Sequence, residues 1–168
     1  QLIGLMGGTI EVISEKGKGT TMTFRIGFKK GTIANLPVQV KEKITGNFLK
    51  GKIILVADDN EMNRLVASTI LANYGARIIE ASNGEEALVV MGKNHIDLIL
   101  MDIQMPVLNG YDATRIIRES NKTIPIIALT ANAVKGESEN CISAGMNDYI
   151  TKPFKEEVFL NIIAHWLK

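Results

Sequence analysis

Cysteine, aromatic residues and long apolar runs are all scarce in this sequence of 168 residues. The single cysteine, Cys141, cannot form an internal disulfide, which fits a reducing, cytoplasmic setting. No apolar run is long enough to cross a bilayer and no signal-peptide pattern opens the chain, so we expect no membrane contact in this segment. Any membrane anchor of a parent protein would lie upstream. Hydrophobic residues still make up 46% of the chain, enough for the core of one domain with an appendage.

A large excess of one charge is also missing, because the net charge is only +1. The two parts of the chain nevertheless differ. Residues 1–50 hold eight Lys and Arg against three Asp and Glu, a net +5, and residues 51–168 hold eleven against fifteen, a net −4. The acidic second part would repel nucleic acid, and the lysines of the first part are scattered through turns. We therefore expect no direct nucleic-acid partner.

Alternating apolar and polar residues near the N-terminus predict an antiparallel hairpin. The alternation covers residues 9–14 and again 20–28, with Gly17 and Gly19 between them. The stretch LMGGTIEVISEKGKGTTMTFRI resembles the C-terminal end of the ATP-binding domain of sensor histidine kinases. The ATP-binding motifs of that family are absent from this chain, so we expect residues 1–29 not to bind ATP. The apolar face of this remnant should pack on the rest of the chain or on a neighbouring molecule.

Residues 30–50 show no sustained period and contain Gly31, Pro37 and Gly46, which predicts a linker. From residue 51 to residue 168, short apolar runs alternate with stretches of helical period. The predicted strands are 52–57, 76–81, 98–101, 125–129 and 148–150, and the predicted helices are 60–74, 83–91, 111–119, 133–144 and 155–167. The inward candidates of the first helix are Leu65, Val66, Ile70 and Tyr74. This alternation predicts an α/β fold with a doubly wound parallel five-stranded sheet.

Polar side chains stand where the predicted strands end. Asp58 and Asp59 follow the first strand, Asp102 follows the third, Thr130 the fourth, and the fifth leads to Lys152. Since the carboxyl ends of parallel strands share one edge of a sheet, we expect these side chains to lie together. Three converging carboxylates repel one another unless a cation joins them, and all-oxygen ligation favours Mg²⁺ over Zn²⁺. The set suits an incoming phosphoryl group.

Four motifs in this part, ILVADDN, LILMDIQMP, IPIIALTANA and DYITKPF, match in order and spacing those of response-regulator receiver domains. Residues 51–168 resemble such a domain, with its flavodoxin-like (βα)5 fold, over their whole length. The resemblance implies that Asp102 is the phosphoacceptor. It implies that Thr130 and Lys152 contact the phosphoryl oxygens, and that the domain catalyses its own phosphorylation and dephosphorylation.

The same resemblance implies a metal site, a switch and an unusual peptide bond. Mg²⁺ would be bound directly by Asp59 and Asp102, by the backbone carbonyl of Gln104, and by Asp58 directly or through water. Tyr149 matches the switch aromatic of the family, which responds to Thr130. The bond between Lys152 and Pro153 matches one that is usually cis in this family.

A kinase end, a linker and a receiver together resemble the C-terminal portion of a hybrid histidine kinase. The donor would be a phosphohistidine of the kinase, and we expect Asp102 to pass the phosphoryl group to a histidine phosphotransfer protein. The residues expected at that docking surface are Asn60, Met62, Asn63, Val66 and the loop after Pro153. In the alternative, the receiver gates its own kinase and never donates onward. A homodimer formed through the last strand and the helices beside it is one expected form of read-out.

Three other classes of protein are compatible with parts of this pattern. A flavodoxin-type nucleotide binder needs a Gly/Ser/Thr-rich loop after the first strand, where Asp58 and Asp59 would repel phosphate. A haloacid-dehalogenase-like phosphatase expects a second Asp where Gln104 stands. A phosphorylation-independent interaction module would lack some of the five strand-end residues, and none is missing.

Overall fold

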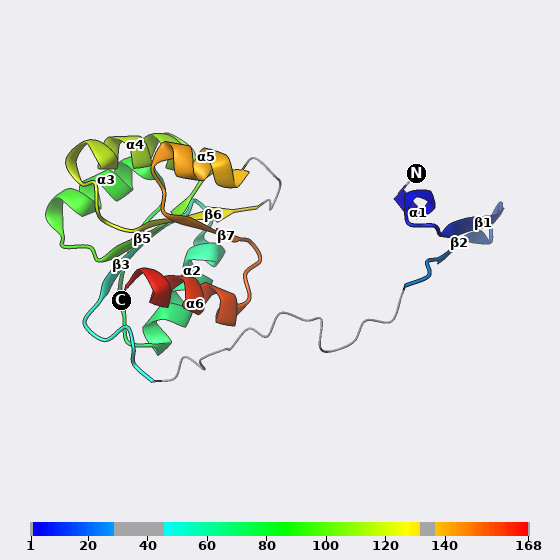
Figure 1. Cartoon of the computed structure of the whole chain (residues 1–168), viewed down its shortest axis with the longest axis horizontal. Helices are drawn as coiled ribbons and strands as arrows, with labels where there is room; N and C mark the ends of the chain where they lie inside the picture. Colours follow the sequence, from blue (N-terminus) through cyan, green and yellow to red (C-terminus); the bar gives the residue numbers. More distant parts are fainter. Residues whose placement is uncertain (1, 29–45, 132–136, 168) are drawn as a thin grey trace. The chain divides into compact units, whose positions relative to one another are not determined.

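The chain divides into two compact units, Gln1–Glu42 and Lys43–Lys168. In this computed structural model the described residues are 2–28, 46–131 and 137–167 (Figure 1). Most of the predicted linker lies outside the described residues. Among the helices of the described residues, none is long and apolar enough to cross a membrane.

The first unit contains a short helix and a two-stranded hairpin, which confirms the predicted hairpin. Helix α1 (Leu2–Leu5) precedes strands β1 (Thr9–Glu15) and β2 (Gly19–Arg25), which pair antiparallel. Cross-strand pairs place Ile10 opposite Phe24 and Val12 opposite Met22 on one face. All residues of both strands are exposed, because two strands have no second layer to cover them.

The second unit is a five-stranded parallel sheet with helices on both sides, as the sequence predicts (Figure 1). The strand order is β4-β3-β5-β6-β7. The strands are β3 (Ile53–Ala57), β4 (Arg77–Ala81), β5 (Leu98–Asp102), β6 (Ile126–Thr130) and β7 (Asp148–Thr151). The helices are α2 (Glu61–Asn73), α3 (Gly84–Lys93), α4 (Gly110–Ser120), α5 (Glu137–Ala144) and α6 (Glu156–Trp166). The predicted start at residue 133 of the helix that corresponds to α5 lies outside the described residues.

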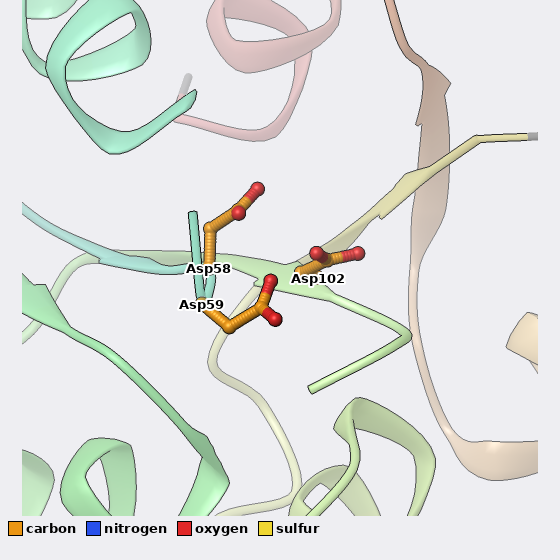
Figure 2. Close-up of side chains that lie close together, drawn as sticks. All are labelled: Asp58, Asp59 and Asp102. Atoms are coloured by element: carbon orange, nitrogen blue, oxygen red, sulfur yellow. The ribbon is translucent and has the colours of Figure 1, made fainter. Parts of the chain in front are cut away.

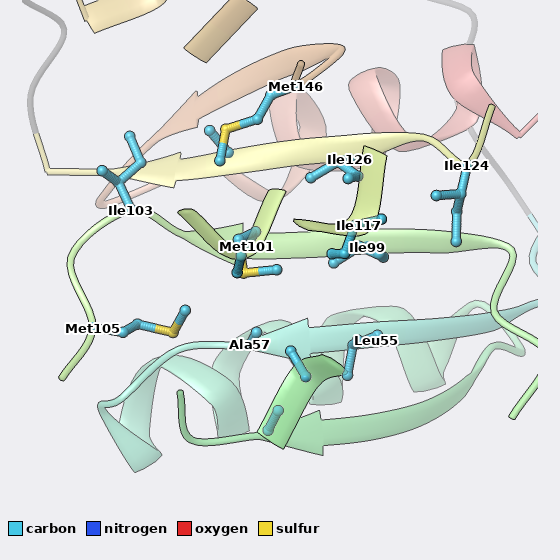
Figure 3. Close-up of a cluster of buried hydrophobic side chains, with 14 of the residues drawn as sticks. Leu55, Ala57, Ile99, Met101, Ile103, Met105, Ile117, Ile124, Ile126 and Met146 are labelled. Carbon is cyan, nitrogen blue, oxygen red and sulfur yellow. The ribbon is translucent and has the colours of Figure 1, made fainter. Parts of the chain in front are cut away.

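The central strand β5 is buried on both faces, which explains its unbroken apolar run. Successive side chains of a strand point to opposite faces. Leu98 and Leu100 therefore pack with α2 and α6, whereas Ile99 and Met101 pack with α3, α4 and α5. Figure 3 shows the second of these clusters, which lies between the sheet and those three helices. Each fully buried side chain of this size contributes about 1.5–3 kcal/mol to stability.

Helix α2 contacts the sheet through Ala67 and Leu71, which are fully buried. The prediction that Leu65 and Val66 point inward was wrong, because they are 56% and 44% exposed. The small Ala67 sits one turn before Leu71 and brings this stripe of the helix onto the sheet, which turns Leu65 and Val66 outward. Two exposed apolar side chains are thereby left beside the carboxyl edge of the sheet. The other inward candidates, Ile70 and Tyr74, do pack on the core.

The packed core of the second unit begins before residue 51. Leu49 is fully buried, and its backbone N–H donates to the Tyr74 carbonyl at 3.0 Å. The Phe48 ring meets the Tyr74 ring edge-on, with centroids 5.5 Å apart. Gly75, at φ 91°, then ends the helix in a conformation that favours glycine. Residues 48 and 49, at the end of the predicted linker, thus pack against the C-terminal end of α2.

Gly110 provides a test of how closely the start of α4 packs on the end of β5. It is the first residue of α4, and a Cβ there would overlap the backbone carbonyl oxygen of Asp102. We expect Gly110→Ala to lower the free energy of unfolding by at least about 2 kcal/mol, measured by urea denaturation. The matched control is Gly92→Ala in α3, where nothing lies within 4 Å of the added Cβ. Gly92→Ala should raise stability by about 0.5–1 kcal/mol, and equal effects of the two substitutions would contradict this packing.

Candidate functional site

The strand register gathers polar side chains at the carboxyl edge of the sheet. The β3–β5 ladder sets Asp58 beside Asp102, and the β5–β6 and β6–β7 ladders set Thr130 and Lys152 one and two positions further along the same edge. Figure 2 shows Asp58, Asp59 and Asp102 leaving the ends of their strands close together. One carboxylate oxygen from each of these three lies within 4.8 Å of the others. Side chains from separate strands therefore meet in one small volume.

The ammonium group of Lys152 joins two of these carboxylates. Its Nζ lies 2.8 Å from Asp58 Oδ2 and 2.8 Å from Asp102 Oδ2. Burial alone would lower the pKa of Lys152, but the hydrogen bonds and attraction from the two carboxylates outweigh burial and raise it. Lys152 is therefore a fixed positive charge at neutral pH.

Asp102 is buried in its surroundings but faces a cleft. The residue is 6% exposed, and this burial raises the pKa of its carboxyl. The negative charge of Asp58 adds to the rise, and the neighbouring Lys152 partly offsets it. The backbone N–H of Gln104 donates to Asp102 Oδ1 at 3.4 Å, a long contact. The cleft has a volume of about 260 Å³ and is lined by Asp59, Asn60, Asn63, Asp102, Ile103, Gln104, Thr130, Ala131 and Lys152.

Asp58 is held by the first turn of α2. Its Oδ1 accepts from the Asn60 backbone N–H at 3.0 Å, and the Asn63 side-chain amide donates to both of its oxygens, at 3.1 and 3.3 Å. The Arg64 guanidinium donates to the Asp58 backbone carbonyl at 2.7 Å and pairs with Glu80 at 3.2 Å. Asn60 also caps α2, its side chain accepting from the second and third N–H groups of the helix. The helix start and the site thus share residues.

The donor set of this cleft suits a hard divalent cation. Its three carboxylates bring three negative charges, which the one ammonium of Lys152 only partly balances. Carboxylate and carbonyl oxygens are the ligands of Mg²⁺, and no nitrogen or sulfur ligand from the described residues lies in this cluster. The residues present therefore fit Mg²⁺ and could hold it through oxygen alone.

The remaining predicted residues lie around the cleft. Thr130 is buried at its base, 3% exposed, and the Lys152–Pro153 peptide bond is cis. Met62 is exposed on α2, and Val66 lines an adjoining groove with Asn63, Ala131, Lys152, Pro153 and Phe154. Tyr149 lies outside the cleft, in a separate groove between β7 and α6, and is 38% exposed.

Sequence reasoning missed two partners of Asp58. Asn63 was expected only at a docking surface, and Arg64 had no predicted role, yet they bind the side chain and the carbonyl of Asp58. Their spacing carried a signal, since residues in the first turn of a helix that follows Asp58 directly can reach back to it. Nothing in the sequence shows which of several polar residues in that turn does so.

Comparisons with known proteins agree with this geometry. The model of the response regulator receiver domain family matches residues 54–164. Sensor protein EvgS of Escherichia coli strain K12 is 37% identical over 173 residues, which cover 98% of this chain and 14% of EvgS. Sensor histidine kinase RcsC of the same strain is 40% identical over 106 residues, 63% of this chain and 11% of RcsC. The chain therefore spans only a small part of these relatives.

Two solved structures are also similar to this chain. The receiver domain of sensor histidine kinase PA1611 from Pseudomonas aeruginosa PAO1, with a magnesium ion in its active site cleft, is 44% identical with a TM-score of 0.65. The match covers 70% of this chain and 98% of that one. Chemotaxis response regulator CheY4 of Vibrio cholerae is 28% identical with a TM-score of 0.66, over 69% of this chain and 98% of that one. The family model matches well over half of the sequence, so this chain belongs to the response regulator receiver family.

Proposed function

We propose that Asp102 accepts a phosphoryl group from a phosphohistidine, with Mg²⁺ as cofactor. The observation that carries this proposal is the Asp102 carboxylate itself, which faces the cleft with the Lys152 ammonium 2.8 Å away. A carboxylate oxygen attacks the phosphorus, the O–P bond forms as the N–P bond of the donor breaks, and the imidazole nitrogen keeps the electron pair. Apart from this nucleophile, the protein contributes position and charge.

The polar residues at the strand ends, together with Gln104, have defined parts in this proposal. Lys152 moves its hydrogen bond from Asp102 to a phosphoryl oxygen, and the Thr130 hydroxyl donates to another. Asp59, Asp102 and the Gln104 carbonyl would hold Mg²⁺ directly, and Asp58 would hold it directly or through water. When bound, Mg²⁺ neutralises the negative charge of the phosphoryl oxygens. Support comes from the oxygen-only donor set and from the magnesium ion of the PA1611 receiver.

Labelling from a small phosphodonor tests the proposal. Incubation with acetyl phosphate and Mg²⁺ should add one phosphoryl mass to the intact protein, and Asp102→Asn should abolish the addition, because an amide is a poor nucleophile. The matched control is Asp97→Asn, the same substitution just before the start of β5, which should still be labelled. Labelling of Asp102→Asn at the wild-type rate would show that the chemistry lies elsewhere, and undiminished labelling in EDTA would show that Mg²⁺ is not required.

We further propose that the phosphoryl group passes on to a histidine phosphotransfer protein. The groove beside the cleft supports this, since it offers Val66, Pro153 and Phe154 as apolar contacts within reach of Lys152. Exposed Met62 and cleft residue Asn60 continue this surface along α2. A partner histidine seated there could approach the Asp102 phosphoryl group in line.

The docking surface predicts a specific mutational effect. Val66→Glu places a charge in the apolar groove and should slow transfer to purified phosphotransfer proteins of the source organism at least about tenfold, as a desolvated charge at an interface does. Val89→Glu is the control, because Val89 is 54% exposed on α3 and lies outside the groove. Labelling by acetyl phosphate reports whether the cleft is intact in both variants. If no phosphotransfer protein gains label faster than Asp102 loses it to water, the gating alternative replaces the relay.

The domain organisation and the switch complete the proposal. Residues 1–29 would be the end of a kinase ATP-binding domain without ATP binding of their own, residues 30–50 a linker, and residues 51–168 the receiver. The alignment with EvgS, which covers 98% of the chain, supports a sensor-kinase context for both ends. Phosphorylation would draw the Thr130 hydroxyl toward the site and let exposed Tyr149 move inward, which changes the β7–α6 face that partners or a second copy would contact.

A further inference from the structure

The carboxylate of Asp58 has its hydrogen-bonding capacity filled before any metal arrives. A carboxylate can accept about four hydrogen bonds. Oδ1 accepts from the Asn60 backbone at 3.0 Å and from the Asn63 amide at 3.1 Å, and Oδ2 accepts from Lys152 at 2.8 Å and from the Asn63 amide at 3.3 Å. Asp58 is 0% exposed, so no bulk water competes for these positions. Half of the four contacts come from Asn63.

The other two carboxylates keep open positions. Asp59 is exposed, and its carboxylate accepts no hydrogen bond from the described part of the chain. Asp102 accepts one short contact from Lys152 and one long contact from Gln104. Asp59 and Asp102 can therefore bind a cation directly, whereas Asp58 must first break a bond to do so, although its oxygens lie within the same 4.8 Å cluster.

We infer that Asn63 is a positioning residue that sets the ion specificity of this cleft. It occupies Asp58 and so keeps a third carboxylate from binding the ion directly. A site with two carboxylates that leaves waters on the ion suits Mg²⁺, which dehydrates reluctantly. A third direct carboxylate in a looser site suits Ca²⁺, which takes six to eight oxygen ligands in flexible geometry. This inference rests on the proposed Mg²⁺ site.

Substitution of Asn63 by alanine separates this role from a structural one. Asn63→Ala frees one lone pair on each oxygen of Asp58. The dissociation constants of Mg²⁺ and Ca²⁺ are then measured for the full chain by titration calorimetry. We expect the ratio of the Ca²⁺ to the Mg²⁺ constant to fall about tenfold, the size expected for loss of an outer partner of a metal ligand. Asn73→Ala, at an exposed asparagine in the last turn of the same helix, should leave the ratio unchanged.

A double variant tests whether Asn63 acts on the bound ion through Asp58. Adding Asp58→Asn to Asn63→Ala removes the charge of the freed carboxylate and should return the ratio to the wild-type value. If Asn63→Ala shifts the Mg²⁺ and Ca²⁺ dissociation constants equally, Asn63 has only a structural role. If the ratio of the two constants stays low in the double variant, Asn63 does not act through Asp58. If the wild-type protein binds neither ion in the cleft, the proposed Mg²⁺ site fails, which is a different outcome from an unchanged ratio.

Discussion

The Lys152 ammonium between Asp58 and Asp102 is the interaction on which the site depends. Two carboxylates that are 0% and 6% exposed would repel each other strongly without it, since buried like charges are weakly screened. Lys152 follows β7, Asp58 follows β3 and Asp102 ends β5, so this contact ties three strand ends together. It also leaves a negative charge in excess, and a divalent cation can balance that excess.

The fold positions this charge cluster through contacts to the backbone carbonyls of Asp58 and Asp102. Arg64 holds the carbonyl of Asp58 and is itself held by Glu80 on β4. Gly110 lies so close to the Asp102 carbonyl that a side chain would not fit. The cluster therefore sits at strand ends and at the start of α2, beside the cleft. A phosphoryl group would enter a site whose charges are already positioned.

Much of this arrangement could be predicted from the sequence, because apolar runs and strand-end aspartates obey simple rules. The sheet follows from five short apolar runs, and the meeting of Asp58, Asp102 and Lys152 follows from parallel strands sharing one edge. The exposure of Leu65 could not be predicted, because the helical period alone does not say whether the sheet is contacted by Ala67 or by Leu65. The hydrogen bonds of Asn63 depend on how α2 is turned on the sheet, which only packing decides.

A direct measurement of the Asp102 pKa tests the account most closely. The account requires that burial hold this pKa above its ordinary value in the metal-free protein and that Mg²⁺ lower it by favouring the charged form. The carboxyl carbon of Asp102 can be followed by ¹³C NMR through a pH titration, in EDTA and in saturating Mg²⁺. We predict a pKa above the ordinary value of an aspartate in EDTA and a clear fall on adding Mg²⁺. A pKa at or below that value without metal, or one that Mg²⁺ does not move, would contradict the account.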